Sequence, residues 1–369
     1  MASMLPTETT AAELELPAFD PRALARRAVL PLAAAAVAVA VLVLAGGPLH
    51  AFTDALRRAL EADPRWVLAA VGFEILSFSG YIGLLWLVGA RATPRMNLRA
   101  SAQVTLAGAA VTRLLPTGGA GGVALTLWAL RRTGLESREA TRTLLTFLVL
   151  LYAVFFAAIA VAGGLIAIGL GGAAGGHVAL AAGASIGAAA VIGVAIAAAL
   201  TRPREGGRIA RTAGSLGHGV RDAIAFLRQA DGRLLGAPIW WAFDAAVLYG
   251  MLNAFGAPPA ISVVVLGYFV GMVANTIPIP GAVSGGMVGV LLAFGVEADL
   301  ALASVLSYRA LAIWLPAPVG LAALGGLRRT VARWGAEGEL DTPAATPAAA
   351  PSPSTRHWAP GREPALHPA

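Results

Sequence analysis

The sequence predicts an all-α polytopic membrane protein, with about six full transmembrane helices and two broken helical hairpins in an inverted-repeat architecture. Hydrophobic residues make up 57% of the 369-residue chain and charged residues only 13%, so most of it is compatible with a bilayer. Two apolar runs are interrupted by proline and glycine, at 113–122 and at 275–295. Broken backbone at membrane depth is tolerated only against protein or a water-filled cavity, which indicates a pocket or pathway.

Six uninterrupted apolar runs have the length of about 20 residues that a crossing requires. Residues 28–326 are predicted to form one transmembrane domain, and 1–27 and the Pro/Ala-rich 327–369 to be disordered. A cleaved signal peptide is the alternative for the first run, disfavoured because the run exceeds the usual apolar core of about 7–15 residues. Trp240 and Trp241 are predicted interfacial anchors. The spans are 28–46, 66–89, 144–170, 178–200, 234–255 and 300–324.

The two broken segments lie at about 100–130 and 261–296. Two full crossings would need about 40 residues, and the first segment has about thirty, so it is either one discontinuous span or a hairpin that re-enters on the same side. A third interpretation is an extramembrane loop between two short, tilted spans, with the glycines allowing close helix packing. The residues at the breaks are Pro116, Gly118, Gly119, Gly121 and Gly122 in the first segment, and Pro278, Pro280 and Gly281 in the second.

Arginine-rich flanks predict the orientation, since short basic loops face the cytoplasm. Both termini and a basic loop at 201–233 are then cytoplasmic in a multi-pass protein of the cell membrane. The first hairpin opens to the cytoplasm and the second to the outside. The arginine-rich segments are 22–27, 91–99, 131–142, 201–233 and 328–333.

An internal repeat at an offset of 161 residues accompanies this topology. Both halves have the order of apolar run, Pro-Gly break, apolar run, Gly-apolar-Glu and long span. Because the copies begin on opposite sides, they are predicted to be inverted-topology repeats, which in transporters often surround a site near the midplane. The matching residues are Leu130, Gly134, Glu136, Ala140 and Leu145, against Leu291, Gly295, Glu297, Ala301 and Leu306.

Four charged residues, Glu74, Arg113, Asp244 and Arg309, interrupt the apolar segments. Each costs about 2.5–3.5 kcal/mol at the membrane centre, so none should face lipid. Either the arginines hold an anionic headgroup through paired hydrogen bonds, or they form structural ion pairs with the two intramembrane acids or extend to an interface. Asn275 is either a hydrogen-bonding residue at the break or a contact between helices.

No motif for catalysis or for a metal or cofactor is present in the sequence, and there is no cysteine. The histidines are scattered. We therefore expect no enzyme activity, no cofactor, no metal and no nucleic-acid partner. The basic excess is expected to reflect the positive-inside topology, although anionic lipid contact by 201–233 is an alternative.

Three segments resemble a flippase-like membrane family that includes the transmembrane domain of lysylphosphatidylglycerol synthases. They are LLPTGGAGGVALTLWALRRTGL (114–135), IPIPGAVSGGMVGVLLAFGV (277–296) and SYRALAIWLPAPVG (307–320). The resemblance covers about 22–333 and implies a domain that moves a phospholipid or lipid-linked headgroup between leaflets. Beside the break residues already named, the matching positions in the last span are Tyr308, Arg309, Trp314 and Pro316.

The chain departs from that family in two ways. The second motif usually has Pro-Gly-Gly and a glutamate a few residues on, whereas here Pro280-Gly281 continues through Ala282, Val283 and Ser284 to Gly285. The synthases also carry a soluble aminoacyl-transferase domain, which is not present in the sequence, so lipid aminoacylation is not expected.

The predicted function is lipid translocation, with Arg309, Arg113, Tyr308 and Asn275 as the candidate headgroup site. The predicted partners are membrane lipids, with an anionic headgroup. One alternative is a secondary transporter of a small polar solute, against which the scarcity of intramembrane acids weighs. Another is a non-catalytic membrane partner of a lipid synthase or glycosyltransferase.

Overall fold

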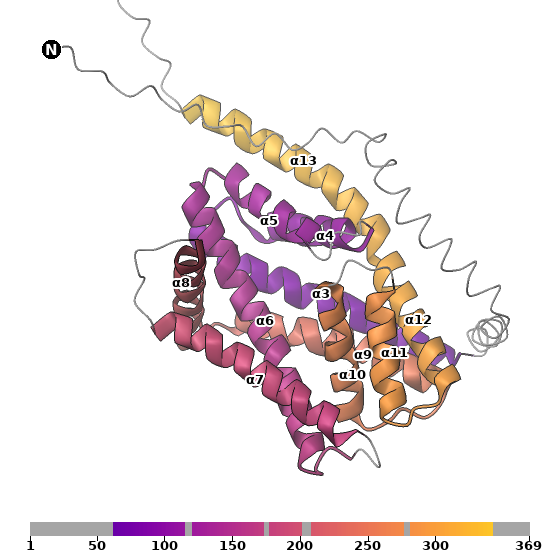
Figure 1. The fold of residues 1–369 in the computed structure, drawn as a ribbon. Helices are drawn as coiled ribbons and strands as arrows, with labels where there is room; N and C mark the ends of the chain where they lie inside the picture. The colour runs from indigo at the N-terminus through magenta and orange to yellow at the C-terminus, as the bar shows by residue number, and fades with distance from the viewer. Residues whose placement is uncertain (1–61, 115–119, 173–176, 201–207, 277–280, 342–369) are drawn as a thin grey trace, which may run out of the picture.

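The computed structural model describes residues 62–341, except 115–119, 173–176, 201–207 and 277–280. This part of the chain is helical and contains no strand. Figure 1 shows the helices as one assembly, with α13 lying along α4 and α5, and α7 at the opposite edge. The elements are α3 (Pro64–Ala92), α4 (Leu98–Leu114), α5 (Ala120–Arg132), α6 (Ser137–Ala167), α7 (Val178–Leu200), α8 (Arg208–Arg228), η1 (Gly232–Leu235), α9 (Gly236–Phe255), α10 (Ile261–Val273), η2 (Ala274–Thr276), α11 (Ala282–Ala293), α12 (Ala298–Trp314) and α13 (Pro316–Asp341).

Five stretches of helix in the described residues are long and apolar enough to cross a membrane. They correspond to the last five predicted spans, so the all-α multi-pass fold class is confirmed. The first predicted span, 28–46, lies outside the described residues, as do 1–27 and 342–369. The five stretches are Pro64–Ala92, Ser137–Ala167, Val178–Leu200, Gly232–Phe255 and Ala298–Glu337.

Two segments are more ordered than the sequence indicated. Residues 327–341, predicted to be disordered, continue α13 as helix to Asp341. Leu327 is fully buried, and the Thr330 hydroxyl donates to Gln103 Oε1 of α4 at 2.9 Å, so packing against α4 extends the helix past the apolar run. The predicted basic loop 201–233 contains α8 over Arg208–Arg228, which packs against α6 and α7.

The prediction that Trp240 and Trp241 are interfacial anchors is wrong. Their side chains are buried at 8% and 5% exposure. The Trp241 indole N–H donates to the carbonyl oxygen of Leu151 on α6 at 2.8 Å, and the Trp240 ring stacks on Tyr81 with centroids 4.6 Å apart. The two rings therefore join α9 to its neighbouring helices inside the protein.

The centre of the molecule is an antiparallel pair, α3 and α9. The start of α3 meets the end of α9, where Asp63 N–H donates to Ala254 O at 3.0 Å. Further along, the Ser77 hydroxyl donates to Trp240 O at 2.9 Å. Gly80 and Gly236 then bring the two backbones together, because a Cβ at Gly80 would lie 2.6 Å from the Gly236 carbonyl oxygen.

We expect Gly80→Ala to lower the free energy of unfolding by about 1–3 kcal/mol, the usual cost of overpacking a tight contact. The added methyl would meet backbone atoms of α9, which cannot rotate away. Gly83→Ala is the matched control, since a Cβ there meets nothing within 4 Å. Unfolding of the purified protein in mixed detergent micelles measures both, and equal stability of the two variants would contradict the contact.

The order of elements from α3 to α6 recurs from α9 to α12. Gly134 and Gly295 follow the equivalent helices α5 and α11, and both have left-handed backbone, with φ of 95° and 79°. Glu136 and Glu297 then occupy the N-cap positions of α6 and α12. The 161-residue offset therefore relates equivalent structural positions, and the antiparallel α3–α9 contact places the two copies head to tail.

Each broken segment forms an antiparallel pair of short helices. In α4 and α5 the pair closes at Gly108 and Gly122, and in α10 and α11 it closes at Gly271 and Gly286. The helices α5, α10 and α11 have only 12 or 13 residues, about 20 Å of helix against a hydrocarbon core of about 30 Å. The first pair packs on α13, which continues the span that α12 begins, and the second packs on α6, the equivalent long span of the first copy. Their re-entry from opposite sides of the membrane stays a prediction.

Candidate functional site: a buried acid–arginine cluster

Arg113, in the last turn of α4, is bound by two acidic side chains from other helices. Its Nη1 donates to Glu74 Oε1 of α3 at 2.8 Å, and its Nη2 lies 3.9 Å from Asp244 Oδ1 of α9. Nη1 also donates to the carbonyl oxygen of Ala312 in α12. The guanidinium carbon lies 5.1 Å from the centroid of the Phe78 ring, within cation–π range.

Two tyrosines complete the cluster around Asp244. Tyr268 of α10 and Tyr308 of α12 both donate their hydroxyl groups to Asp244 Oδ2, Tyr308 at 3.1 Å. Both rings are almost fully buried. We call Glu74, Arg113, Asp244, Tyr268 and Tyr308 the acid–arginine cluster; its members come from α3, α4, α9, α10 and α12.

The central antiparallel pair explains why the two acids meet. Ser77 contacts Trp240 across the α3–α9 interface. Glu74 lies about one turn before Ser77, and Asp244 about one turn after Trp240, so the antiparallel register places the two carboxyl groups on facing turns. Each residue is only 1% exposed. The sequence could not show this proximity, which depends on the register between helices about 170 residues apart.

Two buried oxygen atoms of the cluster have no hydrogen-bond donor among the described residues. They are Glu74 Oε2 and Asp244 Oδ1, one on each carboxyl group. With both carboxyls ionised, two negative charges face the one guanidinium. Buried charge of this kind is costly unless a further positive group or a proton balances it.

Of the four predicted headgroup residues, Arg113 and Tyr308 belong to the cluster, and both lie close to Asp244. Arg309 is half-buried on α12 and makes no hydrogen bond or ion pair with any residue that the structure describes. Asn275 is half-buried in η2, and its side chain has no hydrogen-bond partner among those residues either. The alternative of structural ion pairs thus fits the geometry of Arg113, Glu74 and Asp244, but not that of Arg309.

Only some of the predicted break residues lie in the part of the chain that the structure describes. Pro116, Gly118 and Gly119 lie outside the described residues, as do Pro278 and Pro280. Gly121 and Gly122 lie in the first turn of α5, and the Gly122 N–H donates to the Thr112 hydroxyl of α4 at 2.9 Å. Gly281 is the N-cap residue directly before α11 and has a left-handed φ of 83°.

The last-span motif marks a boundary between helices. Trp314 ends α12 and is 70% exposed, and Pro316 is the first residue of α13, where a missing N–H costs least.

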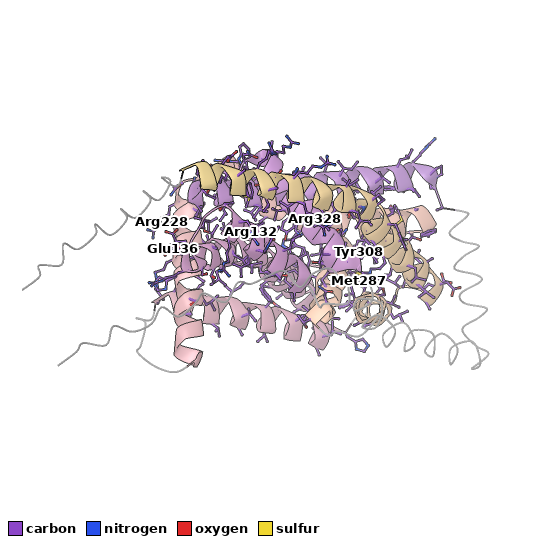
Figure 2. All side chains as sticks on the ribbon, turned by 90° about the horizontal axis from the view of Figure 1, so that it is seen from above. Arg132, Glu136, Arg228, Met287, Tyr308 and Arg328 are labelled. Atoms are coloured by element: carbon purple, nitrogen blue, oxygen red, sulfur yellow. The ribbon has the colours of Figure 1, made fainter. Side chains whose placement is uncertain are left out.

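Figure 2 shows Tyr308 and Met287 toward one side of the assembly, and Arg132, Glu136 and Arg228 toward the other. The arginines near the ends of α5 and α8 are thus separated from the cluster.

Sequence reasoning missed Tyr268 as a member of the cluster. A single tyrosine in a mostly apolar helix was the available signal, since a buried phenol needs a hydrogen-bond partner. No group of three or more His, Cys, Asp or Glu that could hold a metal ion occurs in the described part of the chain.

These features define a class: a helical multi-pass membrane protein that has two pairs of short helices and a buried ionic cluster between its central spans. The family model for the lysylphosphatidylglycerol synthase transmembrane region matches residues 28–320. The chain therefore belongs to that family, and it is a membrane protein related to lipid metabolism. No curated protein sequence matches it closely enough to be counted as a relative.

Proposed function

We propose that this protein moves a lipid with an anionic headgroup between the leaflets of the cell membrane, with Arg309 as the residue that binds the headgroup. The observation that carries the proposal is the position of Arg309 on α12. It lies 11 residues from Ala298, the start of the helix, or about 16 Å along it. This is about half the thickness of the hydrocarbon core.

The faces of α12 show how a lipid would approach Arg309. One face is buried and carries Val305, Tyr308 and Ala312; another is exposed and carries Leu306, Ala310 and Trp314. Arg309 is half-buried between the two. A guanidinium there can reach a phosphate that enters sideways from the bilayer while the acyl chains stay in lipid. A soluble solute would not need such a lateral position.

Arg113 does not serve as a second phosphate ligand in this proposal. Its donors already contact Glu74, Asp244 and the Ala312 carbonyl oxygen. It instead fixes α4 against α3, α9 and α12. Tyr308, which neighbours Arg309 in sequence and donates to Asp244, connects the headgroup residue to the cluster.

The two halves of the molecule are the moving parts that we propose. The copies α3–α6 and α9–α12 meet in the antiparallel α3–α9 contact, and rocking about this contact would expose Arg309 to one leaflet at a time. Both termini would face the cytoplasm. A lipid-synthesising enzyme is the partner that would supply the substrate, in keeping with the family's relation to lipid metabolism.

Leaflet-to-leaflet transfer of labelled anionic lipids in vesicles tests the proposal. We expect the wild type to exceed empty vesicles, and Arg309→Ala to slow transfer about tenfold or more, since a charged hydrogen bond contributes about 1.5–3 kcal/mol. Arg309→Lys should retain part of the rate, because the charge remains without the bidentate geometry. Arg142→Ala is the control, since Arg142 pairs with Asp222 at an exposed position.

No acceleration for any anionic lipid would overturn the proposed function. Ion-driven uptake of a polar solute by the same vesicles would favour the secondary transporter instead. A normal transfer rate in Arg309→Ala would remove Arg309 from the headgroup site. Copurification with a synthase, together with no lipid transfer by the wild type, would favour the role of a non-transporting partner.

A further inference from the structure

The acid–arginine cluster contains an unequal number of ionisable groups of each sign. Glu74 and Asp244 contribute two carboxyls, Arg113 one guanidinium, and the two tyrosines are neutral donors. With both carboxyls ionised the cluster carries one net negative charge in a nearly solvent-free site. An unbalanced buried charge costs several kcal/mol even after the protein relaxes. A bound positive species would remove this cost.

The unpartnered oxygen atoms show where such a species would bind. Among the described residues, Glu74 Oε2 and Asp244 Oδ1 have no donor, and the two carboxyl groups contact the same guanidinium, Glu74 Oε1 at 2.8 Å and Asp244 Oδ1 at 3.9 Å. Ionised carboxylates only accept hydrogen bonds, so the two carboxyl groups can bond to each other only when one of them is protonated. We propose that one proton binds between Glu74 and Asp244, carried on Glu74 Oε2 and donated to Asp244 Oδ1, and that the cluster couples transport to proton movement.

The hydrogen bonds assign the proton to Glu74 rather than Asp244. Asp244 Oδ2 accepts from the hydroxyls of Tyr268 and Tyr308, and both bonds stabilise its ionised form. Among the residues that the structure describes, Glu74 accepts only from Arg113 Nη1. The charged and titratable groups around Glu74 are Arg113 of α4, which contacts it directly, Asp244 of α9, which contacts the same guanidinium, and Tyr308 of α12, which donates to Asp244 and is followed by Arg309.

A proton fits the site better than a metal cation. Arg113 already supplies a positive charge between the carboxylates, so a second cation would be repelled at close range. Metal ions of the hard class also need several oxygen ligands, whereas in the described part of the chain only one oxygen on each of the two carboxyls is left without a donor. A single proton satisfies both oxygens and brings the cluster to neutrality.

The coupling rests on the proposed function. With Glu74 protonated the cluster is neutral, and an anionic headgroup can bind at Arg309, next to Tyr308. Loss of the proton returns a net negative charge close to that position, which repels the headgroup and favours its release. Lipid transfer would then follow the direction of a proton gradient.

Infrared spectroscopy of the purified full-length protein tests proton binding without any transport. We expect a carboxylic C=O band that titrates between about pH 4 and 9, a range wide enough for a perturbed carboxyl group, and that disappears in Glu74→Gln. Asp222→Asn, which changes a half-buried acid paired with the exposed Arg142, should keep the band. If Glu74→Gln does not fold, Asp244→Asn is expected to shift the titration, because it replaces the neighbouring carboxylate. Absence of such a band, or a band that follows Na⁺ concentration instead of pH, would overturn the proton site.

Transfer in vesicles with a clamped membrane potential tests the coupling. A one-unit pH gradient is expected to shift the distribution of the labelled lipid between leaflets by up to about tenfold for one coupled proton, and Glu74→Gln is expected to remove the shift. Transfer that ignores the gradient would refute coupling and leave the proposed function standing. The infrared band without lipid transfer under any condition would refute the proposed function and leave the proton site standing.

Discussion

Replacing Arg113 with alanine is expected to lower the free energy of unfolding by about 3–5 kcal/mol, the cost of removing one partner from a buried ionic network. The change leaves Glu74 and Asp244 facing each other, each 1% exposed, without the guanidinium that lies between them. It also leaves the carbonyl oxygen of Ala312 without its side-chain donor. Unfolding in mixed detergent micelles measures the loss.

Neutralising the acids should reverse much of this loss. In Arg113→Ala combined with Glu74→Gln and Asp244→Asn no unpaired charge remains, and the two amides can bond to each other and to the tyrosine hydroxyls. Arg142→Ala is the matched control, because its pair with Asp222 is exposed and should contribute only about 0–1 kcal/mol. A triple variant no more stable than Arg113→Ala would show that the loss comes from packing rather than charge.

The last five spans and the two pairs of short helices could be predicted because their signal is local. Runs such as 178–200 are apolar throughout, and α7 has the bounds that the sequence predicted. Glycine and proline mark the ends of short helices for backbone reasons: Gly281, for example, directly precedes α11 and has a positive φ. The repeat was visible for the same reason, since both copies place a left-handed glycine and an N-cap glutamate before their long span.

Partners and burial could not be predicted, because they depend on how distant helices pack. The sequence singled out Glu74, Arg113 and Asp244 as buried charges, but it left open whether the arginine would bind a ligand or an acid. Trp241 was misassigned because an indole N–H can be satisfied by a carbonyl oxygen inside the protein as well as by an interface. The sequence placed the end of the last helix too early, because α13 packs against α4 and continues as helix beyond the apolar run.

Joining the two repeats by a disulfide is expected to abolish lipid transfer. The chain has no cysteine, so an introduced pair is the only thiol pair present. A Cβ at Gly250 of α9 would lie 3.4 Å from the Cβ of Ala70 in α3, close to the spacing of about 3.5–4.5 Å that a disulfide requires. In Ala70→Cys/Gly250→Cys, a membrane-permeant oxidant should stop transfer, and a reductant should restore it, because the link holds one end of the α3–α9 contact closed.

A disulfide within one repeat separates rocking of the repeats from motion inside a hairpin. A Cβ at Gly286 of α11 would lie 3.5 Å from the Cβ of Ala274 in η2, so Ala274→Cys/Gly286→Cys links the two arms of the second hairpin. If each repeat moves as a rigid body, this variant transfers lipid equally well when oxidised and when reduced. Inhibition by this link, with normal transfer in the oxidised Ala70→Cys/Gly250→Cys variant, would place the motion within the hairpin. The α3–α9 contact would then be a fixed scaffold instead of the axis on which the protein rocks.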